Sequence, residues 1–190
     1  MAAPKASDAD RVAYFEAAGW RAYYDRAWLR LLRLIVSLFH EQFHIPFPVS
    51  WLAAYYVVRA SIAWVPLDHD THKVQRFYTR FYRIARRYSG LQYDPVEAGR
   101  LELAYNDIHR QLSGQSDKTA FIETMVALHS TIFGISPDQA RESAELRVRA
   151  NTLVDAISAK RSTDPEADWR KIEKYLSQCY RSIVAAVRTR

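Results

Sequence analysis

The segment from Ser50 to Val65 reads SWLAAYYVVRASIAWV and is apolar on every side of a helix except at Arg59. A surface helix has one apolar stripe and one polar face, so a helix that is apolar all round is typical of a buried position. At about 1.5 Å per residue it would be roughly 24 Å long, which suits the centre of a bundle. It is shorter than the ~20 residues that a membrane crossing needs. The sequence therefore predicts a buried central helix over residues 50–65.

Arg59 is the charged exception in this helix. A guanidinium keeps its proton inside a protein, and a buried charge needs an anion beside it. Asp68, shortly after the helix, and Glu102, on a later helix, are the candidate partners. We therefore expect Arg59 to form part of a polar centre with at least one carboxylate.

Helix ends can be located from capping residues. Asp94-Pro95, Ser136-Pro137 and Asp164-Pro165 each place an N-cap oxygen before a proline at the first helical position. Gly90, Gly114 and Gly134 follow apolar-periodic segments, where a left-handed residue ends a helix. No stretch alternates apolar and polar residues as a strand does. The chain is predicted to be an all-α, single-domain bundle of about seven or eight helices, over 8–18, 21–44, 50–65, 71–89, 95–112, 118–133, 137–160 and 165–188, in which the first two could be one interrupted helix.

The composition is consistent with a single helical domain and indicates a cellular location. The 190 residues, 49% hydrophobic and 25% charged, are ordinary for one globular domain. A single cysteine, Cys179, excludes an internal disulfide and fits a cytoplasmic location. The N-terminal residues lack the apolar core of a signal peptide, no segment reads as a membrane span, and residues 1–7 are predicted to be a flexible tail. A homo-oligomer is compatible with this composition.

The helix over 137–160 is predicted to lie on the outside of the bundle. Its recognisable apolar stripe consists of Leu146, Ala150, Leu153 and Ile157, and much of the remainder is charged.

His40, Glu41 and His44 match the H-E-x-x-H pattern, in which two histidines one turn apart hold zinc and the glutamate acts as a base. Three features count against a metal site here. Both histidines fall on the polar side of their helix, Pro46 ends that helix at once, and no third ligand follows shortly downstream. Glu41 and His44 also form one E-x-x-H pair, whereas di-iron bundles need two. A polar helix face is the simpler interpretation.

Two further histidines fall near apolar stripes. His129 sits in the middle of the apolar face of the helix over 118–133, where it is either a hydrogen-bonded core residue or a haem or metal ligand. His109 shares one edge of the helix over 95–112 with Glu102 and Tyr105, and this set could line an elongated pocket. A structural ion pair and hydrogen bond is the more common explanation of the same set.

Basic side chains form a stripe along the helix over 71–89, made up of His72, Arg76, Arg80, Arg83 and Arg87. Such faces bind nucleic acids, membranes or acidic partners. The aromatic residues of this helix lie on its other side, so base stacking between the arginines is disfavoured and a nucleic-acid role with it. The alternative is a solvated face paired with acidic neighbours.

Three functional hypotheses follow. The first is a helical binding protein with a pocket for an anionic or aromatic small ligand, lined by Arg59, Asp68, Glu102, Tyr105, His109 and His129. The second is a metal- or haem-dependent enzyme that uses histidine and glutamate ligands. The third is a protein or nucleic-acid interaction through the 72–87 stripe. The sequence leaves open whether any reaction is catalysed.

Overall fold

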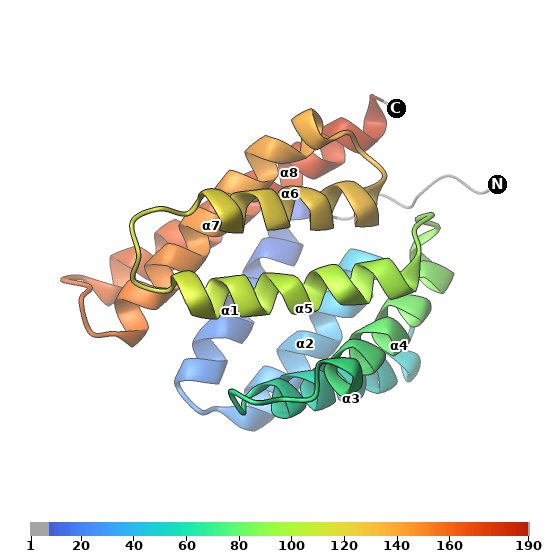
Figure 1. The fold of residues 1–190 in the computed structure, drawn as a ribbon, viewed down its shortest axis with the longest axis horizontal. Helices are drawn as coiled ribbons and strands as arrows, with labels where there is room; N and C mark the ends of the chain where they lie inside the picture. Colours follow the sequence, from blue (N-terminus) through green and yellow to red (C-terminus); the bar gives the residue numbers. More distant parts are fainter. Residues whose placement is uncertain (1–7, 190) are drawn as a thin grey trace.

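The computed structural model describes residues 8–189, and within them the chain forms eight helices and no strand (Figure 1). The predicted tail over 1–7 lies outside the described residues. The all-α prediction is confirmed. The first two helices are separate, although their junction falls later than predicted. The helices are α1 (Ala9–Tyr24), α2 (Trp28–Phe43), α3 (Val49–Trp64), α4 (Thr71–Ser89), α5 (Pro95–Leu112), α6 (Thr119–Phe133), α7 (Pro137–Ser158) and α8 (Pro165–Arg188).

The capping residues mark the starts and ends of helices where the sequence predicted them. Asp94 and Asp164 accept backbone N–H bonds at the starts of α5 and α8, and each precedes a proline in the first turn. Ser136 and Gln139 form a complete capping box on α7. Gly90, with a φ of 75°, adopts the left-handed conformation that ends α4. Local chemistry therefore fixes most of the helix boundaries.

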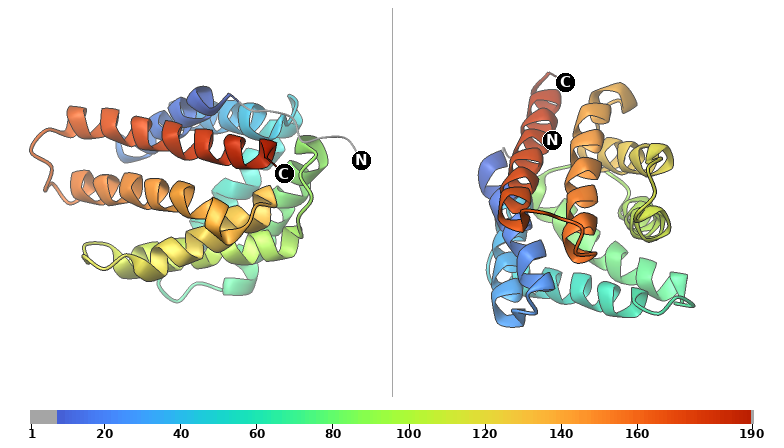
Figure 2. Two further views of the ribbon diagram at one scale, coloured as in Figure 1. Left: turned by 90° about the horizontal axis from the view of Figure 1, so that it is seen from above. Right: turned by 90° about the vertical axis from the view of Figure 1, so that its left-hand side faces the viewer.

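Seven of the eight helices pack into a closed ring. Following the contacts between neighbours, α1 packs against α2, α2 against α4, and α4 against α5; then α5 meets α6, α6 meets α7, α7 meets α8, and α8 returns to α1. The two views of Figure 2 show α7 and α8 side by side along one flank of the molecule. The remaining helix, α3, packs outside this ring on α2 and α4. Among residues 8–189, no helix occupies the middle of the ring.

The predicted burial of the 50–65 helix is wrong. The helix forms, as α3, but it runs along the lower edge of the molecule in Figure 1. Only its small residues Ser50, Ala53, Ala54 and Ala60 are buried. Large apolar side chains such as Ile62, which is 62% exposed, face outward. Apolar residues on every side show that a helix has no polar face. They do not show that every side of the helix is covered by other parts of the same chain.

The predicted environment of Arg59 is wrong for the same reason. Arg59 is exposed, and its guanidinium bonds the Tyr55 hydroxyl at 3.1 Å and lies over the Phe77 ring. Neither Asp68, which is exposed in the loop after α3, nor Glu102 forms an ion pair with it in the described part of the chain. An arginine in contact with solvent needs no buried carboxylate.

The arginine that lies inside this fold is Arg147, on α7, whose side chain is largely covered. Its guanidinium makes a two-pronged ion pair with Glu16 of α1 and donates to the Tyr180 hydroxyl of α8 at 3.1 Å. The side chains of Arg147 and Glu16 are 15% and 7% exposed. The helix α7, predicted to lie outside, buries a second stripe that includes Ala140, Ala144 and Asn151. The ion pair therefore joins three helices at one point inside the ring.

Removing Arg147 should destabilise the protein far more than removing Arg59. Arg147→Met strands the Glu16 carboxylate in a buried position, which typically costs about 3–5 kcal/mol. Arg59→Met is the matched control, because it deletes the same group from an exposed site. Urea unfolding followed by circular dichroism measures both. Equal losses of unfolding free energy in the two variants would contradict this assignment.

Candidate functional site

A cavity of about 680 Å³ occupies the middle of the helix ring. All eight helices contribute to its wall, so it is a property of the whole fold rather than of one hairpin. The wall is mainly apolar and aromatic; examples are Phe15, Trp20, Ile35, Leu38, Phe81 and Leu128. Ligand pockets typically have 300–1,000 Å³ and such a lining. The cavity therefore has the size and chemistry of a site for a small molecule.

Gly19 shows independently that there is room beside α1. It lies in the middle of the helix, where glycine costs about 0.5–1 kcal/mol relative to alanine. A Cβ atom built on Gly19 would meet no heavy atom within 4 Å, although the residue is buried. Gly19 therefore faces the cavity, and a side chain at this position would enter it.

The cavity opens between the end of α1, the start of α2 and the end of α3. Tyr23, Trp28, Ile62 and Val65 line it and are also 50%, 57%, 62% and 62% exposed. These residues belong to both the inner wall and the outer surface, so they form the mouth.

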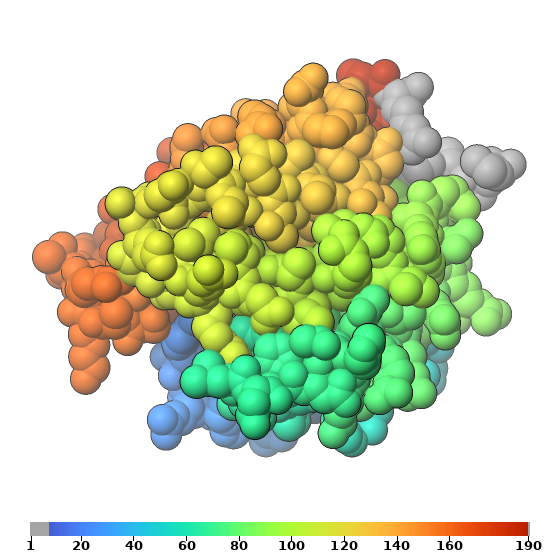
Figure 3. Space-filling model, in the orientation of Figure 1, coloured from blue at the N-terminus to red at the C-terminus, as the bar shows by residue number. Residues whose placement is uncertain are grey.

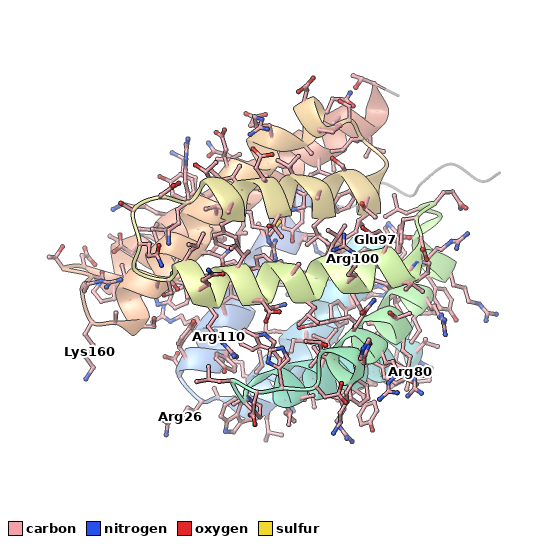
Figure 4. All side chains as sticks on the ribbon, in the orientation of Figure 1. Arg26, Arg80, Glu97, Arg100, Arg110 and Lys160 are labelled. Carbon is pink, nitrogen blue, oxygen red and sulfur yellow. The ribbon has the colours of Figure 1, made fainter. Side chains whose placement is uncertain are left out.

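The end of α3, next to this mouth, is attached to α5. Trp64 donates through its indole N–H to Asp107 at 2.8 Å, and its ring centre lies 3.4 Å from the guanidinium carbon of Arg110. Arg110, labelled in Figure 4, also donates to the backbone oxygen of Trp64 at 3.0 Å. His69, on the loop that follows α3, lies 3.6 Å from the Asp107 carboxylate. One edge of the mouth is therefore held by α5.

Glu102 is the acidic group of the cavity that has no basic partner. It lies deep in the protein yet is only partly buried, because it lines the cavity. Tyr82 donates to its carboxylate at 2.7 Å. None of the ion pairs within residues 8–189 includes Glu102. Burial raises the pKa of Glu102, although the Tyr82 hydrogen bond and the charge of Arg147 act in the opposite direction.

Tyrosines and an asparagine extend this polar region. The Asn106 amide donates to the Tyr78 hydroxyl at 3.2 Å, and both residues line the cavity. Tyr105, which also lines it, donates to Asn151 at 3.1 Å. Burial is the main cause that raises the pKa of Tyr105 to about 12, so its hydroxyl keeps its proton at neutral pH. The cavity therefore presents neutral hydroxyl and amide groups beside the Glu102 carboxyl.

His129 is a neutral histidine in the cavity wall. Its Nδ1 lies 2.8 Å from the Ser143 hydroxyl, which itself donates to the backbone oxygen of Ala140. The proton between His129 and Ser143 must therefore belong to Nδ1, which leaves Nε2 as an acceptor. Burial, assisted by the charge of Arg147, lowers the pKa of His129 from 6.5 to about 3. The imidazole is uncharged at physiological pH.

The polar part of the cavity wall also includes the ion pair described above. Its three members, Arg147, Glu16 and Tyr180, all line the cavity. Burial alone would lower the pKa of Arg147, but the Glu16 carboxylate outweighs it and the pKa is raised. The Tyr180 hydroxyl donates in turn to Glu16. Because this guanidinium is engaged by Glu16, it is not available to a guest molecule as an unpaired cation.

The structure brings together only some of the predicted site residues. Glu102, Tyr105 and His129 all line the cavity. Arg59 and Asp68 lie on the surface outside it. His109 bonds Asp155 at 3.0 Å and stacks on Phe121, so it joins α5 to α7. The predicted pocket therefore exists with a different set of polar groups.

The three residues of the H-E-x-x-H pattern do not converge. His44 ends α2 in the left-handed conformation, His40 contacts the backbone of Ile45, and Glu41 pairs with Arg11 at 3.2 Å. Within the described residues, no group of three or more His, Cys, Asp or Glu side chains is placed to hold a metal ion. Because α2 ends at Phe43, His44 is not one helical turn from His40 on the same helix face, which the zinc-binding pattern requires.

The basic stripe lies on the surface, as the sequence indicated. His72, Arg76, Arg80, Arg83 and Arg87 are all exposed along α4. No ion pair in the part of the chain described reaches them, so the predicted pairing with acidic neighbours is not found. Cys179 is fully buried, and burial raises its pKa to about 12, which keeps it a thiol.

Sequence reasoning missed Glu16 and Arg147. Arg147 falls between Glu145 and Arg149, which suggests a solvated helix face. The available signal was the spacing of small residues in line with it, because Ala140, Ala144 and Asn151 recur every three or four positions with Arg147. A polar residue within such a stripe is typical of a buried contact between closely packed helices.

His129 should make the protein less stable in acid. The unfolded chain protonates this histidine near pH 6.5, but the folded chain resists protonation to about pH 3. Its contribution is therefore full above about pH 6.5 and is lost as the pH falls towards 3. Glu102 has the opposite sign, because its raised pKa favours protonation of the folded state. Thermal unfolding across this range should show a smaller acid-induced fall in melting temperature for His129→Gln. Identical profiles for the variant and the unmodified chain would show that His129 titrates normally.

Comparisons of the chain with protein-family models, curated proteins and solved structures find no match. Function therefore has to be argued from this cavity and its surroundings. The described residues also include no helix long and apolar enough to cross a membrane.

Proposed function

We propose that this chain is a binding protein that holds an aromatic or otherwise apolar small molecule in the cavity between its helices. The observation that carries this proposal is a cavity of about 680 Å³ with an apolar wall and an inward-facing carboxyl, Glu102, that has no basic partner. A few convergent polar groups in a mostly apolar pocket are what fixes the orientation of a ligand. The hydrogen-bonding groups of the guest would lie at Glu102, Tyr82 and Asn106.

The charges around the cavity favour a neutral or cationic guest. Arg59, which suggested an anionic ligand, lies outside, and Arg147 is already paired with Glu16. Two carboxyl groups therefore accompany one guanidinium in the wall. A buried anion beside Glu102 would lose hydration without gaining a counter-ion. A protonated amine or a hydroxyl donor would instead satisfy the Glu102 carboxylate.

The alternative to a binding protein is a haem-dependent enzyme, and the position of His129 favours it. His129 lines the cavity as a neutral imidazole whose Nε2 is an acceptor, which is the form that ligates iron. The absorption spectrum of the untagged protein, as purified and after addition of haemin, decides between the two functions. A Soret band that His129→Ala abolishes would support the enzyme. A colourless preparation with no spectral change would support the binding protein.

A side chain at position 19 should block binding without harming the fold. We expect Gly19→Leu to fill part of the cavity and to weaken binding of the neutral fluorophore N-phenyl-1-naphthylamine by about tenfold or more, a loss of ~1.4 kcal/mol. Gly19→Ala is the matched control, because it gives a similar gain in helix propensity with one added carbon. Fluorescence titration measures the affinity, and thermal unfolding confirms the fold. Equal affinities for both variants would mean that the fluorophore binds elsewhere.

Glu102 should determine the charge preference of the cavity. We expect 1-naphthylmethylamine, a cation, to displace the fluorophore about tenfold more strongly than 1-naphthoate, an anion of similar size. Glu102→Gln should remove this preference, because it removes the carboxylate but keeps the shape. Glu97→Gln is the control: Glu97 lies on the same helix but on the surface, paired with Arg100 (Figure 4). An unchanged preference in Glu102→Gln would exclude Glu102 from the site.

A further inference from the structure

Exposed large hydrophobic side chains are concentrated in one region of the chain. In residues 8–189, all of them except Tyr14 and Val96 lie between Tyr23 and Leu67. Leu29 and Leu67 are 79% and 86% exposed. A contiguous exposed apolar surface marks an interaction site. We refer to this surface as the α3 face; its members are Trp28, Leu29, Phe47, Trp51, Leu52, Tyr55, Ile62, Val65 and Leu67.

The parts of the α3 face adjoin one another in space. α3 and the α1–α2 junction lie along the lower edge in Figure 1 and again in the right-hand view of Figure 2. In Figure 3 the α3 segment and the following loop cover the lower margin, with the start of α2 beside them. Trp28, Ile62 and Val65 from these segments line the same cavity mouth. Together they form one surface rather than scattered side chains.

The stretch of sequence that includes the α3 face also carries the positive charge of the protein. Residues 26–87 hold ten Lys and Arg against three Asp and Glu, a net charge of +7, whereas the whole chain carries +6. None of the nine arginines in this range takes part in an ion pair within the described residues. Figure 4 places Arg26 and Arg80 at the lower left and lower right, on either side of α3. Arg59 lies within the α3 face itself, and Arg80 lies over the Tyr56 ring.

We propose that the α3 face binds the surface of an anionic lipid bilayer. Tryptophan and tyrosine favour the interface between headgroups and acyl chains. Helices that lie in this plane combine such an apolar face with basic side chains, without crossing the bilayer. Each arginine near an anionic surface adds attraction, and these arginines have no internal ion pair to break on binding. Because Arg26, Arg59 and Arg80 lie on or beside the α3 face, apolar burial and charge attraction act on the same side of the molecule.

Charge distinguishes this partner from a second copy of the chain. A two-fold dimer through the α3 face would bring two surfaces of net positive charge together, and like charges across an interface oppose association. An anionic bilayer supplies the opposite charge together with an apolar layer. Of the two partners, the lipid surface satisfies both properties of the α3 face.

Docking in this way would also place the cavity mouth against the lipid. Trp28, Ile62 and Val65 belong both to the mouth and to the α3 face. If the cavity takes an apolar guest, as proposed above, the guest would pass between bilayer and cavity without crossing water. This step rests on the proposed function, whereas docking itself does not.

Flotation of the full chain with vesicles tests the docking. We expect binding to vesicles of equal parts phosphatidylcholine and phosphatidylserine at low salt, weaker binding at high salt, and little binding to phosphatidylcholine alone. Absence of binding to the anionic vesicles at low salt would overturn the proposal.

Two sets of variants separate apolar from charge effects. The apolar variant, Leu29→Ser/Leu52→Ser/Leu67→Ser, should lose about tenfold or more in vesicle affinity. Its control is Tyr14→Ser/Val96→Ser, the exposed hydrophobic residues elsewhere. The charge variant, Arg26→Gln/Arg59→Gln/Arg80→Gln/Arg83→Gln, should lose a comparable factor. Its control removes four positive charges from other surfaces: Arg149→Gln/Lys160→Gln/Arg170→Gln/Lys174→Gln.

The outcomes distinguish the two proposals. Leu29, Leu52 and Leu67 do not line the cavity, so the apolar variant should bind N-phenyl-1-naphthylamine as tightly as the unmodified chain. Equal vesicle binding by each variant and its control would refute docking through the α3 face. A dimer that the apolar variant converts to monomer, with no vesicle binding, would assign the face to a second copy.

Discussion

The ion pair between Glu16 and Arg147, with the Tyr180 hydroxyl, is the interaction on which this architecture depends. It joins α1, α7 and α8 where the chain returns to its beginning, and so it closes the ring of helices. A buried guanidinium without its carboxylate would be costly, so this closure tolerates little rearrangement. It also occupies Arg147, the one arginine of the described residues that lines the cavity, which leaves Glu102 without a basic partner. The fold and the electrostatics of the cavity therefore have a common origin.

A ring of helices leaves its centre to be filled by side chains, and here they fill it incompletely. Gly19 contributes no side chain on one side, and α1 packs against its ring neighbours α2 and α8, which leaves volume in the centre. The polar groups on the inner wall are satisfied mostly by one another: Tyr82 with Glu102, Asn106 with Tyr78, and His129 with Ser143. Such a network keeps its geometry in the absence of a guest, which makes the cavity preformed.

The sequence predicted the helices well and their environments less well. Caps such as Asp94, Ser136 and Gly90 act locally, so helix ends could be read from a few neighbouring residues. The position of α3 depends on how seven other helices pack, and its apolar composition did not reveal that one side would remain exposed. Glu102, Tyr105 and His129 were identified because they interrupt or border apolar stripes. Arg147 was missed because its charged sequence neighbours suggested solvent, whereas its ion-pair partner lies 131 positions away.

The attachment of Trp64 to Asp107 and Arg110 has a consequence for the rate at which a guest would exchange. Since the end of α3 is attached to α5 by a hydrogen bond and a stacked guanidinium, this edge of the entrance is held in place while the side chains around it can move. The remaining obstacles are the exposed rings of Tyr23 and Trp28, and exposed side chains change rotamer within picoseconds to nanoseconds. Entry that needs only such side-chain movements would be fast, and differences in affinity between guests would appear mainly as differences in residence time.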